Sequence, residues 1–286
     1  MHWKEEDYND LLAGLSIDTS GHWQEWEWSQ VGPRTSYDFA RLEEYRDAVI
    51  VAYRLYNRIG LEHAKCMLAK APRTAKLLDA GGGTGRKAIP LAQMGFVDIT
   101  VLDHAPGWLQ LADEKARQAG VRERLTLLEG DIRDMRLCAA NQFDYVFALG
   151  GVVSYCGDPA QAIDEMARVL KPGGELLADG IHSRFGSIRF TARTGNWEAF
   201  ETLTNDAEHR GQQAVLLPEE LETLARQSGL THTRVWSEFL FELDETIRVG
   251  AGSERWEKAI LELEMRYYDD PRFLGGTGLI LRASKV

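Results

Sequence analysis

A run of glycines next to an aspartate is the stretch of this sequence best suited to bind a ligand. The segment D-A-G-G-G-T-G, Asp79–Gly85, directly follows a short apolar strand. Gly81, Gly83 and Gly85 have no Cβ atom, so the backbone there can adopt positive φ and approach a ligand closely. A helix expected to begin near Thr84 would direct free N–H groups at the same place. The stretch therefore predicts a strand–turn–helix ligand site.

Two carboxylates accompany this turn. Asp79 stands at the end of the strand, where it can accept a hydrogen bond from a ligand's amino group or hold the loop through its N–H groups. Residues 97–103, V-D-I-T-V-L-D, are expected to form the next strand, which ends in Asp103. Asp103 comes roughly twenty residues after the glycines, where nucleotide-binding α/β units place a carboxylate for the ribose hydroxyls. His104 follows it, and we expect it near adenine or ribose.

The glycine spacing separates two classes of ligand. Dinucleotide-binding turns read G-x-G-x-x-G, and Arg86 occupies the place of their third glycine. This spacing disfavours an NAD-type oxidoreductase. An ordinary strand–turn–helix without a ligand does not explain three glycines together with Asp103.

Further strands and turns follow in a regular order. Leu125–Leu128 predicts a third strand and leads into E-G-D-I, Glu129–Ile132. Gln142–Leu149 is an almost continuous apolar run, typical of a central strand in a parallel sheet. Gly150 and Gly151 then permit a tight turn.

The following segment completes the pattern. Pro159–Leu170 has the apolar spacing of an amphipathic helix, and the turn K-P-G-G leads from it into a strand at Glu175–Ile181. Alternating strands and helices imply right-handed crossovers and a doubly wound sheet, with ligands at the carboxyl ends of the strands.

Three motifs, D-A-G-G-G-T-G, E-G-D-I and R-V-L-K-P-G-G-E-L-L, together resemble those of the class I S-adenosylmethionine (SAM)-dependent methyltransferases. The resemblance covers Lys76–Ile181. It implies an enzyme that uses SAM and releases S-adenosylhomocysteine, without a metal. In this family Asp131 would accept from the adenine amine, Ile132 would pack on the adenine ring, and helices ahead of the glycines would supply an aromatic residue. The implied cofactor-binding residues are Tyr37, Asp79, Gly81, Gly83, Asp103, His104, Asp131, Ile132 and Leu149.

The expected fold is α/β, with a doubly wound, mostly parallel seven-stranded sheet and helices on both faces. Residues 1–70 form an acidic, Trp-rich segment and a helical cap, and residues 71–286 form the SAM-binding domain. A substrate cover is inserted after strand five, at about 183–217. The remaining expected helices and strands are helices at 37–55, 62–69, 106–119, 218–228 and 254–268 and strands at 231–237 and 278–284. The Trp-rich segment is interpreted as a packed clamp, with a substrate-facing lid as the alternative.

The candidate catalytic residues follow the fourth and fifth strands. His182 and Tyr155 are the two that we select as a general base, which methyl transfer needs only if the acceptor arrives protonated. Arg184, Arg189 and Arg193 suit a carboxylate or phosphate on the substrate. The competing interpretation of His182 is a hydrogen-bonded structural histidine, and that of the three arginines is a solvent-exposed surface.

Composition narrows the partners. The net charge of −11 argues against a general binder of nucleic-acid backbones, so we expect no DNA and no general RNA binding. The three cysteines form no C-x-x-C pair, and the start has no signal-peptide pattern, which together predict a cytoplasmic protein. No apolar run reaches the length of a membrane span, and no His/Cys/acid cluster has metal-ligand spacing. We expect a monomer or homodimer.

Three functions are compatible with these patterns. The first is methylation of an oxygen, nitrogen or carbon of a small metabolite. The second is methylation of a tRNA nucleoside, because the tail L-E-L-E-M-R-Y-Y-D-D-P resembles the subgroup that includes the tRNA carboxymethoxyuridine carboxyl-methyltransferase. The third is a SAM-binding protein without enzymatic activity. No motif is degraded in a way that would favour this third function.

Overall fold

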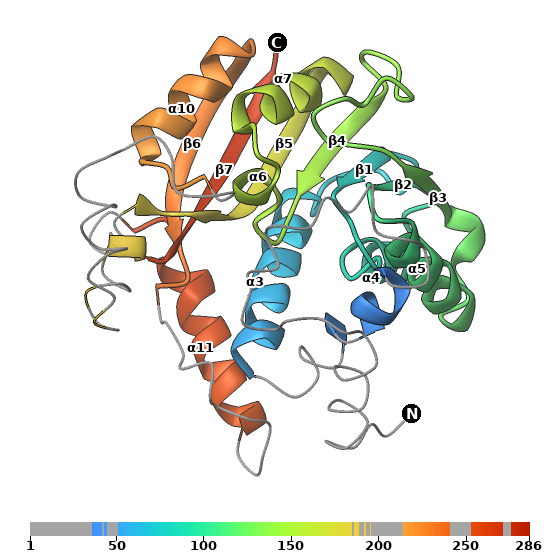
Figure 1. The fold of residues 1–286 in the computed structure, drawn as a ribbon, viewed down its shortest axis with the longest axis horizontal. Helices are drawn as coiled ribbons and strands as arrows, with labels where there is room; N and C mark the ends of the chain where they lie inside the picture. Colours follow the sequence, from blue (N-terminus) through green and yellow to red (C-terminus); the bar gives the residue numbers. More distant parts are fainter. Residues whose placement is uncertain are drawn as a thin grey trace.

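Seven strands form one sheet at the centre of the protein (Figure 1), seen in a computed structural model that describes residues 36–41, 43–44, 51–184, 186–188, 192, 195, 214–240, 253–270 and 276–286. The strands are β1 (Lys76–Ala80), β2 (Asp98–Asp103), β3 (Leu125–Glu129), β4 (Phe143–Ala148), β5 (Leu170–His182), β6 (Leu230–Glu238) and β7 (Gly278–Lys285). They lie in the order β3-β2-β1-β4-β5-β7-β6.

The sheet is parallel except for one strand. Every neighbouring pair from β3 to β5 is parallel, and β7 runs antiparallel to both β5 and β6. The strand order reverses between β1 and β4, so the loops that follow these two strands diverge at the carboxyl edge of the sheet. A ligand in an open α/β sheet binds in that crevice. The expected seven-stranded, mostly parallel sheet is confirmed.

Helices cover both faces of the sheet. They are α3 (Val51–Met67), α4 (Ala88–Gln93), α5 (Pro106–Gln118), the 3-10 turn η3 (Arg122–Arg124), α6 (Val152–Tyr155), α7 (Pro159–Val169), α10 (Pro218–Gln227) and α11 (Ser253–Tyr267). Buried side chains of α7 and α10 share one apolar cluster with the strands, and those of α3, α4 and α5 share another. These two layers bury the sheet on both sides, as the continuous apolar run of β4 requires.

Two helix boundaries differ from the sequence-based expectation. The sequence predicted a break between two helices at 37–55 and 62–69. This break is wrong, because α3 is continuous through Gly60. A Cβ atom on Gly60 would lie 2.2 Å from Oδ2 of Asp179, so the glycine serves close packing and not a helix break. The helix expected near Thr84 begins only at Ala88. Gly85 has a φ of 75°, and this left-handed conformation cannot start an α-helix.

Residues 36–41, 43 and 44 are helical and are bound to the glycine turn and to α5 by hydrogen bonds. Glu44 accepts hydrogen bonds from Arg86 Nε at 2.9 Å and Lys115 Nζ at 2.8 Å, and also from the Thr84 hydroxyl. Ser36 Oγ accepts from the backbone N–H at the start of α5 at 2.9 Å. The described part of the N-terminal region therefore packs against the glycine turn. The Trp-rich residues 1–35 and most of the expected cover at 183–217 lie outside the described residues.

Within the described residues, no helix combines the length and the apolar character that a membrane span requires.

Replacing Glu44 by glutamine tests this attachment. Burial raises the pKa of Glu44, but the charges of Arg86 and Lys115 and hydrogen bonds from Lys115 and Thr84 outweigh burial and bring it from 4.5 to about 2. A lowered carboxyl pKa stabilises the folded state above pH 4.5 and loses this effect as pH falls toward 2. Glu44→Gln should therefore cost about 1–3 kcal/mol at pH 7, the range for hydrogen bonds to charged groups.

The measurement is urea unfolding of both proteins at several pH values, together with hydrogen exchange of residues 36–44. The difference in unfolding free energy should narrow steadily below pH 4.5. Asp113→Asn removes a carboxylate that pairs with Arg117 and Arg122, and it is the control for hydrogen exchange, in which residues 36–44 should keep their native exchange rates. A difference that is the same at pH 7 and pH 3.5 would contradict the assignment.

Candidate functional site

The glycine turn after β1 is bent back onto the end of β2. The N–H groups of Gly81 and Gly82 both donate to the carbonyl oxygen of Leu102, at 2.7 and 3.1 Å. Gly81 and Gly83 have φ values of 72° and 54°, in the region that favours glycine. A Cβ atom on Gly81 would lie 2.5 Å from the Val152 side chain, so the turn is packed as closely as glycine permits.

Asp103 holds this turn in place. Its Oδ2 accepts the N–H of Gly83 at 2.9 Å, and its Oδ1 accepts the N–H of Ala105, also at 2.9 Å. Burial raises the pKa of the Asp103 carboxyl, against the lowering effect of His104 and the backbone amides. The expected contact with ribose stays a prediction, for which each carboxylate oxygen keeps a second lone pair.

Asp79 is the buried acid nearest the base of the turn. It is 2% exposed, and its Oδ2 has no hydrogen-bond partner among the described residues. Burial raises its pKa to about 7, although Lys87 and the Ala88 amide act in the opposite direction. An orphaned buried carboxylate oxygen costs free energy until a donor reaches it. The residue is therefore suited to receive a cationic group of a ligand.

An indole covers the outer side of the turn. A Cβ atom on Gly83 would lie 2.8 Å from Cε3 of Trp108, and Phe39 stacks on the same indole with ring centroids 6.2 Å apart. The sequence pattern did not select either aromatic residue. Tyr37, the aromatic residue that it did select, donates its hydroxyl to Glu114 on α5 at 2.7 Å. Its contact with a cofactor remains a prediction.

The other residues expected near adenine follow β2, β3 and β4. His104 is half exposed, and its Nδ1 lies 3.8 Å from Oδ1 of Asp103. Asp131 accepts hydrogen bonds from the Arg133 side chain, the shortest at 2.6 Å, and from its N–H at 2.8 Å. Ile132 and Leu149 are buried in the two apolar clusters. The expected contacts of these four residues with the cofactor stay predictions.

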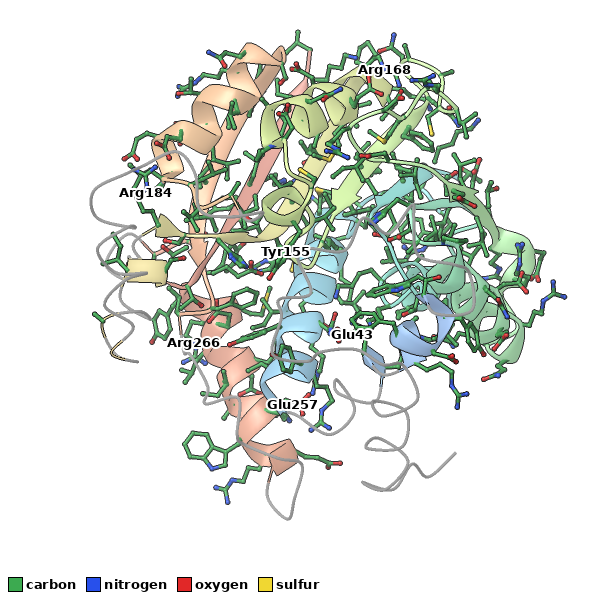
Figure 2. All side chains as sticks on the ribbon, viewed as in Figure 1. Glu43, Tyr155, Arg168, Arg184, Glu257 and Arg266 are labelled. Carbon is green, nitrogen blue, oxygen red and sulfur yellow. The ribbon has the colours of Figure 1, made fainter. Side chains whose placement is uncertain are left out.

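Tyr155 and His182 form a pair. The Tyr155 hydroxyl lies 3.2 Å from Nε2 of His182, and the rings meet edge to face with centroids 5.1 Å apart. Tyr155 is 49% exposed and lies near the centre of the view in Figure 2. The ring packs on Gly151, whose Cβ, if present, would lie 2.9 Å from Cε2 of Tyr155. The two catalytic candidates are thus brought together at the carboxyl edge of the sheet.

The structure describes one of the three arginines expected to bind an anion, Arg184. Arg184 makes two hydrogen bonds with the Glu220 carboxylate, at 3.0 and 3.1 Å, and its label lies at the left edge of Figure 2. Its charge is therefore already compensated. Arg189 and Arg193 lie outside the described residues.

The structure brings together a second set of buried charges, which the sequence analysis did not predict as a group. Lys87, Asp179 and Glu238 are each at most 6% exposed, and Lys87 Nζ donates to Asn57 on α3 at 2.7 Å. Burial raises the pKa of Asp179 to about 6 and, with the charge of Asp179, raises that of Glu238 well above its usual range. Asp179 lies near the end of β5, Glu238 at the end of β6 and Lys87 just before α4, and no sequence motif connects the three.

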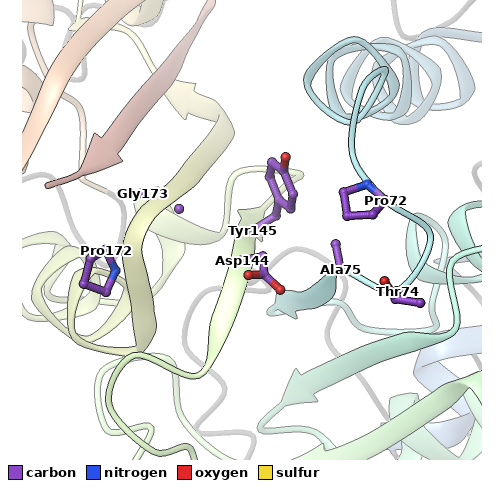
Figure 3. A pocket seen from close by; sticks show the side chains of 8 residues that line it. Pro72, Thr74, Ala75, Asp144, Tyr145, Pro172 and Gly173 are labelled. Atoms are coloured by element: carbon purple, nitrogen blue, oxygen red, sulfur yellow. The ribbon is translucent and has the colours of Figure 1, made fainter.

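A cavity of about 280 Å³ lies at the other edge of the sheet (Figure 3). It is lined by Pro72, Thr74, Ala75, Asp144, Tyr145, Pro172, Gly173 and Gly174, which are at the amino ends of β1 and β4 and in the turn within β5. Asp144 accepts there from the N–H of Lys76 and from Lys171. The cavity therefore lies away from the glycine turn and from the Tyr155–His182 pair.

Within the described part of the chain, no group of three or more histidine, cysteine, aspartate or glutamate side chains is arranged to hold a metal ion.

Comparison with known proteins agrees with this geometry. A methyltransferase-domain family model matches residues 77–174. A 2-methyl-6-phytyl-1,4-hydroquinone methyltransferase of Oryza sativa subsp. japonica is 36% identical over 123 residues, which are 42% of this chain and 33% of the relative. The tRNA 5-carboxymethoxyuridine methyltransferase of Escherichia coli K12 is 25% identical over 205 residues, 68% of this chain and 74% of the relative.

The solved structures share the fold. A SAM-dependent methyltransferase of Thermotoga maritima, described as a possible histamine N-methyltransferase, superposes with a TM-score of 0.55 at 19% identity over 91% of this chain and all of the other. The match to the Oryza relative spans about one third of that relative's length, so its activity does not transfer to this chain directly. The family resemblance seen in the motifs is confirmed: residues 77–174 match a methyltransferase domain, and the solved structure shares its fold.

Proposed function

We propose that the protein is an enzyme that transfers a methyl group from SAM to an oxygen, nitrogen or carbon of a small metabolite. The observation that supports it best is the coincidence of the matched domain with the closely packed glycine turn between Asp79 and Asp103. A sulfonium makes the methyl group of SAM electrophilic. What the protein contributes is in-line positioning of the acceptor about 3 Å away.

The residues present fit the cofactor. The orphaned Oδ2 of Asp79 suits the ammonium group of the methionine moiety. Asp103 suits the ribose hydroxyls, and the half-exposed His104 next to it suits the adenine or ribose. The indole of Trp108, over Gly83, offers an apolar surface on the same side.

The Tyr155–His182 pair supplies a proton acceptor for a protonated nucleophile. The Tyr155 hydroxyl lies 3.2 Å from Nε2 of His182, so as the tyrosine oxygen takes the proton of the nucleophile, its own hydroxyl proton passes to the neutral imidazole. This assignment is consistent with the positions of the two residues, since Tyr155 ends α6, which follows β4, and His182 is the last residue of β5. An acceptor that arrives already ionised requires only their positioning role.

Two lines of support favour a small acceptor. Several relatives are named for quinone-type substrates, among them the Oryza enzyme and a demethylmenaquinone methyltransferase of Renibacterium salmoninarum, 29% identical. The net charge of −11 disfavours the salt-dependent contacts that RNA binding needs.

Three free cysteines without a C-x-x-C pair support a reducing, cytoplasmic setting.

The second candidate is methylation of a tRNA nucleoside. Its support is the length of the match to the E. coli tRNA enzyme, which extends over 68% of this chain, against 42% for the Oryza relative. The two candidates differ in the acceptor and not in the cofactor site.

One assay separates the candidates. The protein is incubated with methyl-labelled SAM and a cell extract, with and without RNase, and in parallel with total bacterial tRNA that lacks the wobble carboxymethoxy ester. We expect label in RNase-resistant small molecules. Stoichiometric label in tRNA would establish the second candidate, and no turnover in either arm would leave a SAM-binding protein.

Binding of S-adenosylhomocysteine should depend on the ionisation of Asp79. The carboxyl has a pKa of about 7 in the free protein, and an ammonium group prefers the ionised form. Protons therefore compete with the ligand below pH 7, and the affinity should fall about tenfold from pH 8 to pH 6. Calorimetry of the native protein and of Asp79→Asn measures this. The variant is the control for titration of the ligand itself, and the same pH dependence in both proteins would remove Asp79 from the ammonium group.

Asp103→Ala should weaken binding of S-adenosylhomocysteine by about 1–3 kcal/mol, the range for a hydrogen bond to a charged group. The change removes the ribose acceptor and also the anchor of the Gly83 amide. Asp103→Asn, which keeps one acceptor oxygen, should lose less. Equilibrium dialysis measures both, and an unchanged affinity of Asp103→Ala would contradict the assignment.

A further inference from the structure

Two buried carboxyl groups, those of Asp179 and Glu238, accept hydrogen bonds from the backbone segments that precede Tyr155 and His182. Oδ1 of Asp179 accepts the N–H of Gly150 at 2.5 Å, and the backbone carbonyl of Asp179 accepts the N–H of Gly151 at 3.0 Å. The turn after β4 is therefore tied twice to a single residue of β5.

The second carboxylate acts on the next residue of β5. Oε2 of Glu238, at the end of β6, accepts the N–H of Gly180 at 2.8 Å. Gly180 has a φ of 64° and lies where the pairing of β5 with β7 shifts register, between Ala178 and Ile181. A Cβ atom on Gly180 would lie 2.6 Å from the nitrogen of Gly151, so the bulge and the turn are in direct contact.

The Gly150–Gly151 turn determines the positions of Tyr155 and His182. The carbonyl oxygen of Gly151 accepts the N–H groups of Ser154 and Tyr155, at 2.9 and 3.2 Å. The hydroxyl of Ser154, which is fully buried, accepts the N–H of His182 at 2.8 Å. A shift of the Gly150–Gly151 turn would therefore displace both rings.

We propose that Asp179 and Glu238 are positioning residues for methyl transfer, which fix the turn after β4 and the bulge in β5 and so set the geometry of Tyr155 and His182. The inference rests on the proposed function for its kinetic consequence. Its structural part, that these carboxylates determine the environment of the His182 ring, stands independently.

Lys87 and Gly60 complete the arrangement. Lys87, which follows the glycine turn, lowers the pKa of Asp179 and of Glu238 by its charge, and its Nζ is held by Asn57 of α3. Gly60, one turn further along α3, leaves the space that Oδ2 of Asp179 occupies, since a Cβ there would lie 2.2 Å from that oxygen. Asp179 can therefore occupy its position only because residue 60 has no side chain.

Gly60→Ala is the decisive variant. Alanine is the better helix former, so a variant that merely altered α3 would fold at least as well as the native protein. We expect instead that its methyl group displaces Asp179. The kcat should fall at least tenfold, and the KM for SAM should stay within twofold, because the glycine turn after β1 is untouched.

Three further variants complete the set. Asp179→Ala should show the same loss, and Asp179→Asn, which keeps an oxygen for the Gly150 amide, should recover more than a third of the native kcat. Asp144→Asn removes a lysine-paired aspartate at the opposite edge of the sheet and is the control with native kcat. Circular dichroism checks folding, and Gly60→Ala provides both readouts if Asp179→Ala does not fold.

The second readout does not depend on turnover. The ring resonances of His182, assigned with His182→Gln, should move in Gly60→Ala and Asp179→Ala and stay in place in Asp144→Asn. Native kcat and unmoved resonances in Gly60→Ala and Asp179→Ala would overturn the proposal. Moved resonances in a protein that turns over no acceptor would support the positioning and count against the proposed function alone.

Discussion

The carboxyl edge of this sheet depends on one kind of contact, a buried carboxylate that accepts a backbone N–H from a loop. Asp103 holds the turn after β1, Asp179 the turn after β4, and Glu238 the bulge in β5. Glu264 of α11 does the same for Leu240, the second residue after β6, at 3.0 Å. Such a contact is among the stronger hydrogen bonds in proteins when the accepting carboxyl group is ionised.

Burial of these acidic side chains costs free energy, and the interactions that offset this cost also fix the positions of the loops. Removing a carboxylate from water is unfavourable unless hydrogen bonds or a cation compensate it. Backbone amides compensate most of them here, and Lys87 stands among Asp79, Asp179 and Glu238 as a shared cation. The result is a set of loops whose positions are determined before any ligand arrives, which reduces the ordering that binding must otherwise bring about.

Local patterns were sufficient to predict the sheet and the glycine turn. Asp79–Gly85 and Asp103 lie close in sequence, and the strand–turn–helix pattern relates them directly. Trp108, Lys87 and Gly60 were not predicted, because each acts through a contact with a distant segment. A glycine within a helical pattern is ambiguous in sequence, and only the position of Asp179 shows why residue 60 has no side chain. The start of α4 was placed too early because the conformation of Gly85 is not visible in its residue type.

The place of β7 has a consequence for how the chain reaches this structure during synthesis. β7 lies between β5 and β6 and pairs with both, although it follows every other strand in the sequence. While the ribosome is still producing residues 241–277, β5 has a free edge whose neighbouring residues Leu176, Leu177 and Ala178 are fully apolar. Unpaired apolar edges invite association with other chains. Because closing distant segments is slow, the nascent protein is exposed to this risk until Gly278–Lys285 leaves the exit tunnel and completes the sheet.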